Sequence, residues 1–269
     1  MEGKNKFKKW IPAFAGMTIW AGMTMTGTAW AVGLVATPST FDFGWCPAEA
    51  KVSAEFIIKN ISDSPISLDS LRPSCGCTAA EFSPETLASD NETKIGLTFN
   101  TRGYEGLSFH KPATLKTGGT DTGIEVTITG FVLDPNAKIV PDGSGLARFE
   151  PGGKKKEIVA IRNKGANEVS LQVVQKPADW ASIDLDSSKI PAGGTTELEI
   201  KVKGSMDETK TTSATFEATG NETPQRFTVA IQTGPKPEAY KPPHGPQPTP
   251  TATPVQSKEK PAKQKNHKK

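Results

Sequence analysis

Apolar and polar residues alternate along most of the chain body. Ile95, Leu97 and Phe99 are separated by single polar or small residues, and residues 124–129 (IEVTIT) alternate in the same way. Successive side chains of a strand point to opposite faces, so a period of two predicts strands with one buried and one solvated face. Turn-forming segments such as residues 191–194 (PAGG) separate these runs. We therefore expect an all-β chain built from short strands.

The pattern occurs twice, at a constant offset of 103 residues. The segment FIIKN at residues 56–60 returns as VAIRN at residues 159–163, and the apolar positions of several other strands repeat with it. A repeat of this length has the size of a domain, and many short strands separated by turns are typical of a β-sandwich. The sequence therefore predicts two tandem β-sandwich domains, over residues 34–133 and 137–233.

The first 31 residues have the features of an export signal. Lys4 to Lys9 supply positive charge, an apolar stretch begins at Trp10, and Ala29-Trp30-Ala31 matches the small-residue pattern of a cleavage site. Gly, Thr and Pro interrupt the apolar stretch, whereas a transmembrane helix needs about 20 strongly apolar residues. We expect a signal peptide over residues 1–31, no transmembrane segment in the mature chain, and a location in the periplasm or cell envelope. A misassigned start codon and an uncleaved membrane anchor are the alternatives.

The composition changes again after Thr233. Residues 234–269 are rich in Pro and contain eight Lys against two Glu. Such a segment cannot bury enough apolar surface to offset the entropy lost on ordering, so we expect a disordered tail. The formal net charge of the whole chain is only +3, which makes the body between the two basic ends acidic. Nucleic-acid recognition requires a basic stripe on a folded surface, so we expect no nucleic-acid partner.

No spacing of residues predicts an enzyme. The sequence lacks Gly-x-Ser-x-Gly, His-Glu-x-x-His and phosphate-binding glycine motifs. His110 is the only one of the three histidines in the predicted folded body, which leaves little material for general acid–base catalysis. We expect no catalytic residue and no cofactor.

The most distinctive local motif is SCGCT at residues 74–78, and Cys46 is the third cysteine. Cysteines of an exported protein normally form disulfides, and a Cys75–Cys77 bond would close a small, easily reduced ring. A bond from Cys46 to either of them would close a larger loop and leave one free thiol. Two thiolates two residues apart can also bind a soft metal such as Cu(I) or Zn. A structural disulfide or inert thiols, a redox-active pair and a metal site thus remain alternatives for Cys75 and Cys77.

Four motifs in the first copy resemble the bacterial family called domain of unknown function 1573. They are FDFG at residues 41–44, FIIKN at 56–60, PISL at 65–68 and SCGCT at 74–78. The resemblance covers residues 34–133 and is weaker over residues 137–233, where the cysteines are missing. Cys46 and the basic tail depart from the pattern of the family. The resemblance implies an immunoglobulin-like fold, related to major sperm protein and Hydin-type domains, and an exported setting, but no activity.

Together these features predict two tandem immunoglobulin-like β-sandwich domains in a non-catalytic binding or structural protein of the cell envelope. Its partner would be a protein or a cell-envelope polymer, held at sandwich surfaces or strand edges and by the basic tail. The alternative is a thiol-based redox or metal-handling protein that uses Cys75 and Cys77. The second copy carries Ala178 and Trp180 at the equivalent positions. The fold therefore does not require these thiols, which favours a role special to the first domain.

Overall fold

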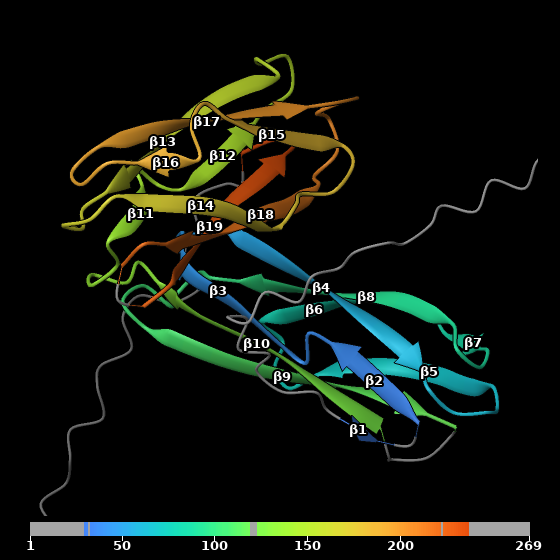
Figure 1. Cartoon of the computed structure of the whole chain (residues 1–269). Coiled ribbons are helices and arrows are strands. Elements are labelled where there is room, and N and C mark those ends of the chain that lie inside the picture. The colour runs from blue at the N-terminus through green and yellow to red at the C-terminus, as the bar shows by residue number, and fades with distance from the viewer. Residues whose placement is uncertain (1–29, 32, 119–122, 222, 237–269) are drawn as a thin grey trace, which may run out of the picture. The chain divides into compact units, whose positions relative to one another are not determined.

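The computed structural model describes residues 30–31, 33–118, 123–221 and 223–236. Most of the predicted signal peptide and of the predicted tail lies outside these residues. The described residues form strands joined by turns and contain no helix (Figure 1). No helix long and apolar enough to cross a membrane therefore occurs in the part of the chain that the structure describes. The all-β prediction is confirmed.

The first sandwich consists of two sheets. Its strands are β1 (Trp30–Ala31), β2 (Leu34–Thr37), β3 (Thr40–Cys46), β4 (Lys51–Asn60), β5 (Ile66–Pro73), β6 (Thr78–Glu81), β7 (Glu85–Leu87), β8 (Glu92–Asn100), β9 (Ser108–Thr117) and β10 (Gly123–Val132). One sheet has the strand order β1-β2-β4-β8-β6, and the other has the order β3-β10-β9-β5-β7. Buried and more exposed residues alternate strictly along β4, as expected for a strand with one face on the core.

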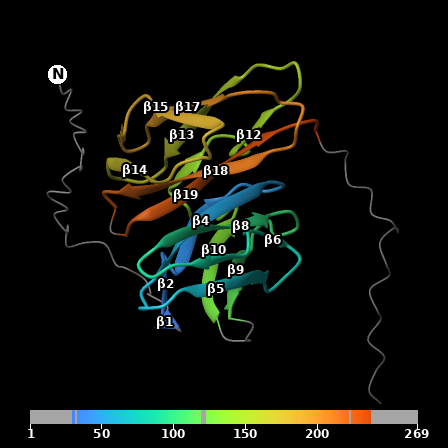
Figure 2. The same cartoon turned by 90° about the vertical axis from the view of Figure 1, so that its right-hand side faces the viewer.

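The second sandwich repeats this arrangement (Figure 2). Its strands are β11 (Ile139–Pro141), β12 (Leu146–Phe149), β13 (Lys156–Asn163), β14 (Val169–Gln175), β15 (Ala181–Leu185), β16 (Lys189–Ile190), β17 (Thr195–Val202), β18 (Thr211–Thr219) and β19 (Gln225–Thr233). Its sheets have the orders β11-β13-β17-β15 and β12-β19-β18-β14-β16. Each strand from β2 to β10 thus has a counterpart at the same place in the second sandwich. The prediction of two tandem immunoglobulin-like sandwiches is confirmed.

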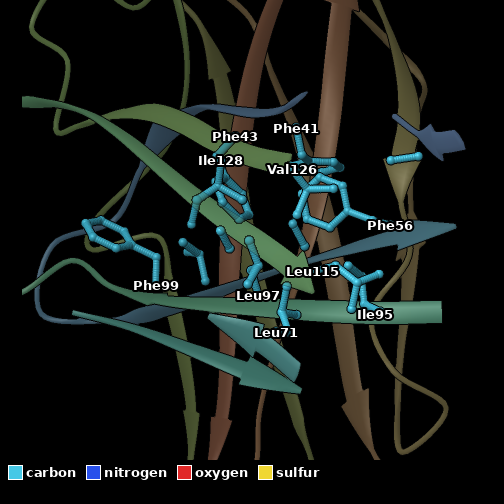
Figure 3. Close-up of a cluster of buried hydrophobic side chains, with 14 of the residues drawn as sticks. Phe41, Phe43, Phe56, Leu71, Ile95, Leu97, Phe99, Leu115, Val126 and Ile128 are labelled. Carbon is cyan, nitrogen blue, oxygen red and sulfur yellow. The ribbon is translucent and has the colours of Figure 1, made fainter. Parts of the chain in front are cut away.

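Apolar side chains from both sheets fill each sandwich. In the first core, Phe43, Val126 and Ile128 lie together, with Leu97 and Phe56 from the facing sheet beside them (Figure 3). All five side chains are fully buried. Burial of apolar surface stabilises a fold by about 25 cal/mol per Å², so these residues supply much of the driving force for pairing the sheets.

A buried asparagine fixes the same turn in both sandwiches. Asn60 Nδ2 donates hydrogen bonds to the carbonyl oxygens of Ser64 and Leu87, each at 2.9 Å. Asn163 Nδ2 donates the equivalent bonds to Asn167 and Ile190, at 2.8 and 3.0 Å. Each partner differs from its counterpart by the offset of the sequence repeat. The repeat is therefore a repeat of specific hydrogen bonds as well as of apolar positions.

The two sandwiches are joined through β3. Trp45 of β3 pairs with Phe227 of β19, so one sheet continues from the first sandwich into the second. The Trp45 side chain is only 6% exposed and belongs to the core of the second sandwich. Thr228 Oγ1 donates a hydrogen bond of 2.8 Å to the carbonyl oxygen of Phe43 beside it. Gly44 has a φ of 63°, and a Cβ there would lie 2.0 Å from the carbonyl oxygen of Arg226. This crossing therefore requires glycine.

Side chains of the second sandwich also cover part of β4. The short strand β2 pairs with β4 only at residues 57–60, which leaves the edge of β4 unpaired by strands near Ser53. Ser213 Oγ donates to the Ser53 carbonyl oxygen at 2.9 Å and accepts from the Ser53 amide at 3.0 Å. Gln175 donates to the same carbonyl at 2.7 Å and accepts from the amide of Glu55 at 2.9 Å. These bonds satisfy backbone groups that would otherwise be available to another strand.

Candidate functional site

The candidate site is the turn that connects β5 to β6. The backbone amide of Ser74 donates to the carbonyl oxygen of Pro112 at 3.0 Å, which ties the end of β5 to β9. The amide of Thr78 then donates to the carbonyl oxygen of Cys75 at 3.3 Å and closes the turn. A Cβ atom at Gly76 would meet nothing within 4 Å, so the tip of the turn faces open space. The SCGCT motif therefore lies at the surface at one end of a rigid sheet.

Cys75 and Cys77 form a disulfide across Gly76, with a Cα–Cα distance of 5.3 Å. Both side chains are half-buried. Cys77 packs against the apolar core of the first sandwich, whereas Cys75 is not part of that cluster of described residues. Cys77 is thus the inner sulfur of the pair and Cys75 is the outer one.

Two hydroxyl groups contact the sulfur atoms. The Tyr104 hydroxyl is 3.7 Å from Cys77 Sγ and can donate a hydrogen bond to it. Thr78 Oγ1 lies 3.6 Å from Cys75 Sγ. The Tyr104 ring makes an edge contact with Phe99 at a centroid distance of 5.1 Å. Lys111 Nζ lies 4.9 Å from the centroid of the same ring and places positive charge near the site. Tyr104 is therefore held in place by packing independent of the sulfur.

The structure places Cys46 apart from this pair, as a free thiol in the first core. It is fully buried at the end of β3, and its Sγ lies 3.7 Å from the carbonyl oxygen of Gly44. Burial raises the pKa of Cys46 well above its ordinary value, and the nearby charge of Asp42 raises it further. Cys46 therefore stays a protonated, inaccessible thiol at neutral pH.

Of the alternatives predicted for the cysteines, the structure contains the Cys75–Cys77 disulfide and leaves Cys46 unpaired. Among the described residues, no cluster of three or more His, Cys, Asp or Glu side chains could hold a metal ion. Metal binding by the two thiolates of reduced Cys75 and Cys77 stays a prediction. Its ligands would have to include groups that come from elsewhere, because tetrahedral structural zinc takes four.

The second sandwich makes the same turn without a disulfide. There the amide of Ala181 donates to the carbonyl oxygen of Ala178 at 2.8 Å, as Thr78 does to Cys75. The amide of Lys203 donates to the carbonyl oxygen of Trp180 at 2.7 Å. In the first sandwich the amide of Asn100 likewise donates to Cys77, at 3.0 Å. The amide of Ala178 also donates to Thr212 Oγ1 at 2.9 Å. The second sandwich thus holds this turn by hydrogen bonds alone, and the disulfide of the first sandwich is an addition to the two main-chain bonds that the turns share.

Beside the disulfide lies a sheet edge. β6 pairs with β8, and no other described strand pairs with the opposite side of β6. The Asn100-to-Cys77 bond sets the alternation, so the amide and carbonyl of Ala80 and the carbonyl of Thr78 point away from β8. β15 occupies the same edge position in the second sandwich, where it pairs only with β17 among the described strands. The two edges are equivalent, and only the first has a disulfide next to it.

The sequence singled out the two cysteines but not the groups around them. Tyr104 is 27 residues from Cys77 in the chain. It reaches the sulfur because β6 pairs with β8 and the chain turns back after β8. Lys111 lies on β9, which belongs to the facing sheet of the first sandwich. No local pattern marks either residue, since their proximity depends on strand pairing across the whole sandwich.

Residues 34–132 match the family model described as "Protein of unknown function (DUF1573)". The resemblance predicted from the motifs of the first copy is thereby confirmed. The match ends before the second sandwich begins. No curated protein matches the chain.

Solved structures similar to this chain include a protein of unknown function from Porphyromonas gingivalis, which is 16% identical. Its TM-score is 0.30, and the alignment covers 75% of this chain and 100% of that chain. A PapD-like domain of human CEP192 is 10% identical, with a TM-score of 0.32 and coverage of 38% of this chain and 86% of that domain. The CupB2 chaperone of Pseudomonas aeruginosa is 9% identical, with a TM-score of 0.30 and coverage of 72% and 98%.

Proposed function

We propose that this chain, whose first sandwich matches the DUF1573 family, is an exported, non-catalytic binding protein of the periplasm or cell envelope. The observation that carries the proposal is the pair of open edges at β6 and β15, each paired on one side only among the described strands. An open edge presents unpaired amide and carbonyl groups to which an extended partner segment can add as a further strand. By contrast, the edge of β4 near Ser53 is not open to a partner strand, because the side chains of Ser213 and Gln175 bind its backbone groups. The other strands at the ends of these sheets, β1, β7, β11 and β16, have only two or three residues each. We therefore assign binding to β6 and β15, which have four and five residues.

A proline scan of β6 tests this binding mode. The amide of Ala80 points away from β8, so Ala80→Pro removes an edge donor and leaves the pairing with β8 intact. Ala79 is the matched control, because its amide points toward β8 and Ala79→Pro breaks the sheet itself. In pull-downs from an envelope fraction of the source cells, Ala80→Pro combined with Ile183→Pro in β15 should lose the partner captured by the native protein. Unchanged capture by a folded double variant would contradict edge binding.

Export rests on the sequence of residues 1–31. Mass spectrometry of the native protein should find an N-terminus at or near Val32, and cell fractionation should place the protein outside the cytoplasm. An intact Met1 on protein from a cytoplasmic fraction would remove this part of the proposal.

The basic tail supplies a second, charge-based contact in the proposal. Its eight lysines are suited to acidic polymers of the envelope, and such attraction weakens as salt rises. The structure corrects the start of the predicted tail, because Gly234 is buried and its amide donates to the carbonyl oxygen of Phe149 at 3.1 Å. Deletion of residues 235–269 should therefore reduce binding to anionic polymers while the free energy of unfolding stays within about half a kcal/mol of the native value. A large loss of stability would show that the tail packs on the sandwiches.

A second candidate function is thiol-based redox or metal handling through Cys75 and Cys77. One observation favours it: the disulfide lies half-buried in a turn that forms without it in the second sandwich. Thiol titration of the purified mature protein, with metal analysis of the same sample, separates the two chemistries. Bound Cu or Zn on the reduced protein would support metal handling, and reversible oxidation of two thiols without metal would support redox exchange.

A further inference from the structure

We propose that the Cys75–Cys77 disulfide exchanges with a dithiol of a partner protein whose extended cysteine-bearing segment adds to the edge of β6. The inference rests on both proposed functions, because it joins the open edge to the disulfide beside it. The turn between β5 and β6 has a counterpart without cysteines in the second sandwich, at residues 178–180. The turn of the second sandwich has the same two main-chain bonds and no disulfide, with a third bond from the Ala178 amide to Thr212. In the first sandwich the bond from the Ser74 amide to Pro112 is the third, so the disulfide can open while three hydrogen bonds hold the turn.

The surroundings of the two sulfurs decide which of them is attacked. Cys77 packs on the core and lies 3.7 Å from the Tyr104 hydroxyl, whereas Cys75 stands outside the core cluster. A phenol is a stronger hydrogen-bond donor than the aliphatic hydroxyl of Thr78, which lies near Cys75. Core packing by itself disfavours a charge on Cys77, and the hydrogen bond from the Tyr104 hydroxyl offsets this cost. We infer that this donor makes Cys77 the better leaving group, and that the more accessible Cys75 is the sulfur attacked. The incoming thiolate attacks Cys75 Sγ, and Cys77 leaves as a thiolate that accepts a hydrogen bond from Tyr104.

The exchange balances without any further reagent. In the first step the partner thiolate forms a bond to Cys75 Sγ, and the electron pair of the Cys75–Cys77 bond passes to Cys77. In the second step the other partner thiolate attacks the partner's first sulfur, and the electron pair of the mixed disulfide passes to Cys75. The partner ends as a disulfide, and Cys75 and Cys77 end as two thiols that carry the two protons. The reaction runs in either direction according to the reduction potentials of the two pairs.

The edge of β6 provides the docking position. The amide and carbonyl of Ala80 point away from β8, only a few residues from the disulfide. A strand advances about 3.3 Å per residue, so a partner segment paired at Ala80 brings a cysteine about three residues further along to the turn. The tip of the turn at Gly76 has open space around it, which leaves room for the incoming sulfur. β15 has the same edge and no sulfur, and it serves as the internal control.

The first experiment locates the reactive sulfur in the full-length oxidised protein. Incubation with glutathione under native conditions, an acid quench and peptide mass spectrometry should find the mixed disulfide on Cys75. Cys46 should remain unmodified because it is buried. A disulfide that is reduced only after the protein has been unfolded in urea would overturn the proposal. An adduct found mainly on Cys77 would overturn the assigned direction of attack.

Tyr104→Phe tests the positioning of Cys77. The variant keeps the ring contact with Phe99 and removes only the hydroxyl, so a purely structural role would leave the exchange rate unchanged. Hydrogen bonds to charged groups are strong enough that the loss of one can change a reaction rate by about tenfold or more. We expect dithiothreitol to open the disulfide about tenfold more slowly, and the pH profile of its re-formation to shift to higher pH. An unaltered rate and an unaltered profile would remove Tyr104 from the mechanism.

A synthetic dithiol peptide with alternating apolar residues tests the docking step. Ala80→Pro should slow exchange with this peptide by about tenfold or more and leave exchange with dithiothreitol unchanged, because only the peptide uses the edge. Ile183→Pro in β15 should change neither rate. Equal slowing of both reagents would mean that Ala80→Pro disturbs the disulfide itself, and unchanged peptide exchange would exclude docking at β6. Edge binding by β15 would survive either result, so the two proposals fail separately.

Discussion

The two sandwiches of this chain have the same strand order and the same buried asparagine, but they differ at the turn before the edge strand. In the first sandwich a disulfide spans Cys75 and Cys77, and in the second Ala178 and Trp180 take these places. The turn-closing hydrogen bond from residue 78 to 75 recurs from residue 181 to 178. The second sandwich therefore acts as a natural control, and it shows that the cysteines are not needed to shape the turn.

A second difference concerns the strand that enters each sandwich. Trp45 of β3 inserts into the core of the second sandwich. Its counterpart at the repeat offset is Arg148 of β12, which donates a hydrogen bond of 2.9 Å to Gln232 of its own sandwich. The first sandwich thus contributes Trp45 to the core of the second. At the equivalent position of the second sandwich, Arg148 contacts its own sandwich instead of the first core. The duplicated domains have become unequal where they meet.

The largest effect is expected from Trp45→Ala. Removal of a buried aromatic side chain costs about 3–5 kcal/mol. Because Trp45 lies in the second core, amide exchange should accelerate at Ile200 of the second core more than at Leu97 of the first. Arg148→Ala is the matched control and should have a small effect. Destabilisation confined to the first sandwich would contradict the assignment of Trp45 to the second core.

The buried asparagines should give the next largest effect, and an equal one in the two sandwiches. Asn60→Ala leaves the buried carbonyl of Leu87 without its side-chain donor, and Asn163→Ala does the same to Ile190. Each loss should reduce the free energy of unfolding by about 2–4 kcal/mol, measured by urea denaturation followed by circular dichroism. A difference of more than about 1.5 kcal/mol between the two variants would show that the two asparagines are not equivalent, because it exceeds the net contribution of a typical single hydrogen bond.

A smaller effect is expected when the disulfide is removed. The ring that it closes contains a single residue between the cysteines, so the chain-entropy relation gives only about 1.5 kcal/mol. The double variant Cys75→Ala with Cys77→Ala should therefore fold with a small loss of stability and no change in far-ultraviolet circular dichroism. Failure to fold would show that the disulfide is structural, and the comparison with Ala178 and Trp180 would then lose its meaning.

The smallest effect concerns an exposed ion pair that only the second sandwich has. Hydrogen bonds of 2.9 Å from Arg162 lower the pKa of Asp142, against a weaker opposing effect of burial. The first sandwich has Ser39 and Lys59 at these positions, so this carboxylate has no equivalent there. Because the folded-state pKa is lowered, the contribution is present above about pH 4 and is lost as pH falls through the folded-state value. Asp142→Asn should remove this pH dependence and change the free energy of unfolding little at pH 7. Urea denaturation of both proteins at pH 7 and at a pH below the folded-state pKa of Asp142 measures the difference.

The sequence predicted much of this fold because the relevant signals are local. A period of two along a strand is a direct consequence of side chains pointing to alternate faces, and a constant offset reports duplication without any knowledge of pairing. The strands around Phe56, Leu97 and Leu198 follow from this pattern, as does the exclusion of long helices. The SCGCT motif was equally visible, because only Gly76 separates its two cysteines in the chain.

Only the tertiary structure decided what surrounds those cysteines and how the two sandwiches meet. The contact of Tyr104 with Cys77 and the open side of β6 depend on which strands pair and in which register. The insertion of Trp45 into the second core depends on one sheet continuing through both sandwiches. Nothing local in the sequence assigns Trp45 to the core of the second sandwich, because a periodic pattern marks buried positions but does not show which strands pair. A side chain's neighbours across a sheet are fixed by long-range pairing, and single-chain periodicity carries no information about that pairing.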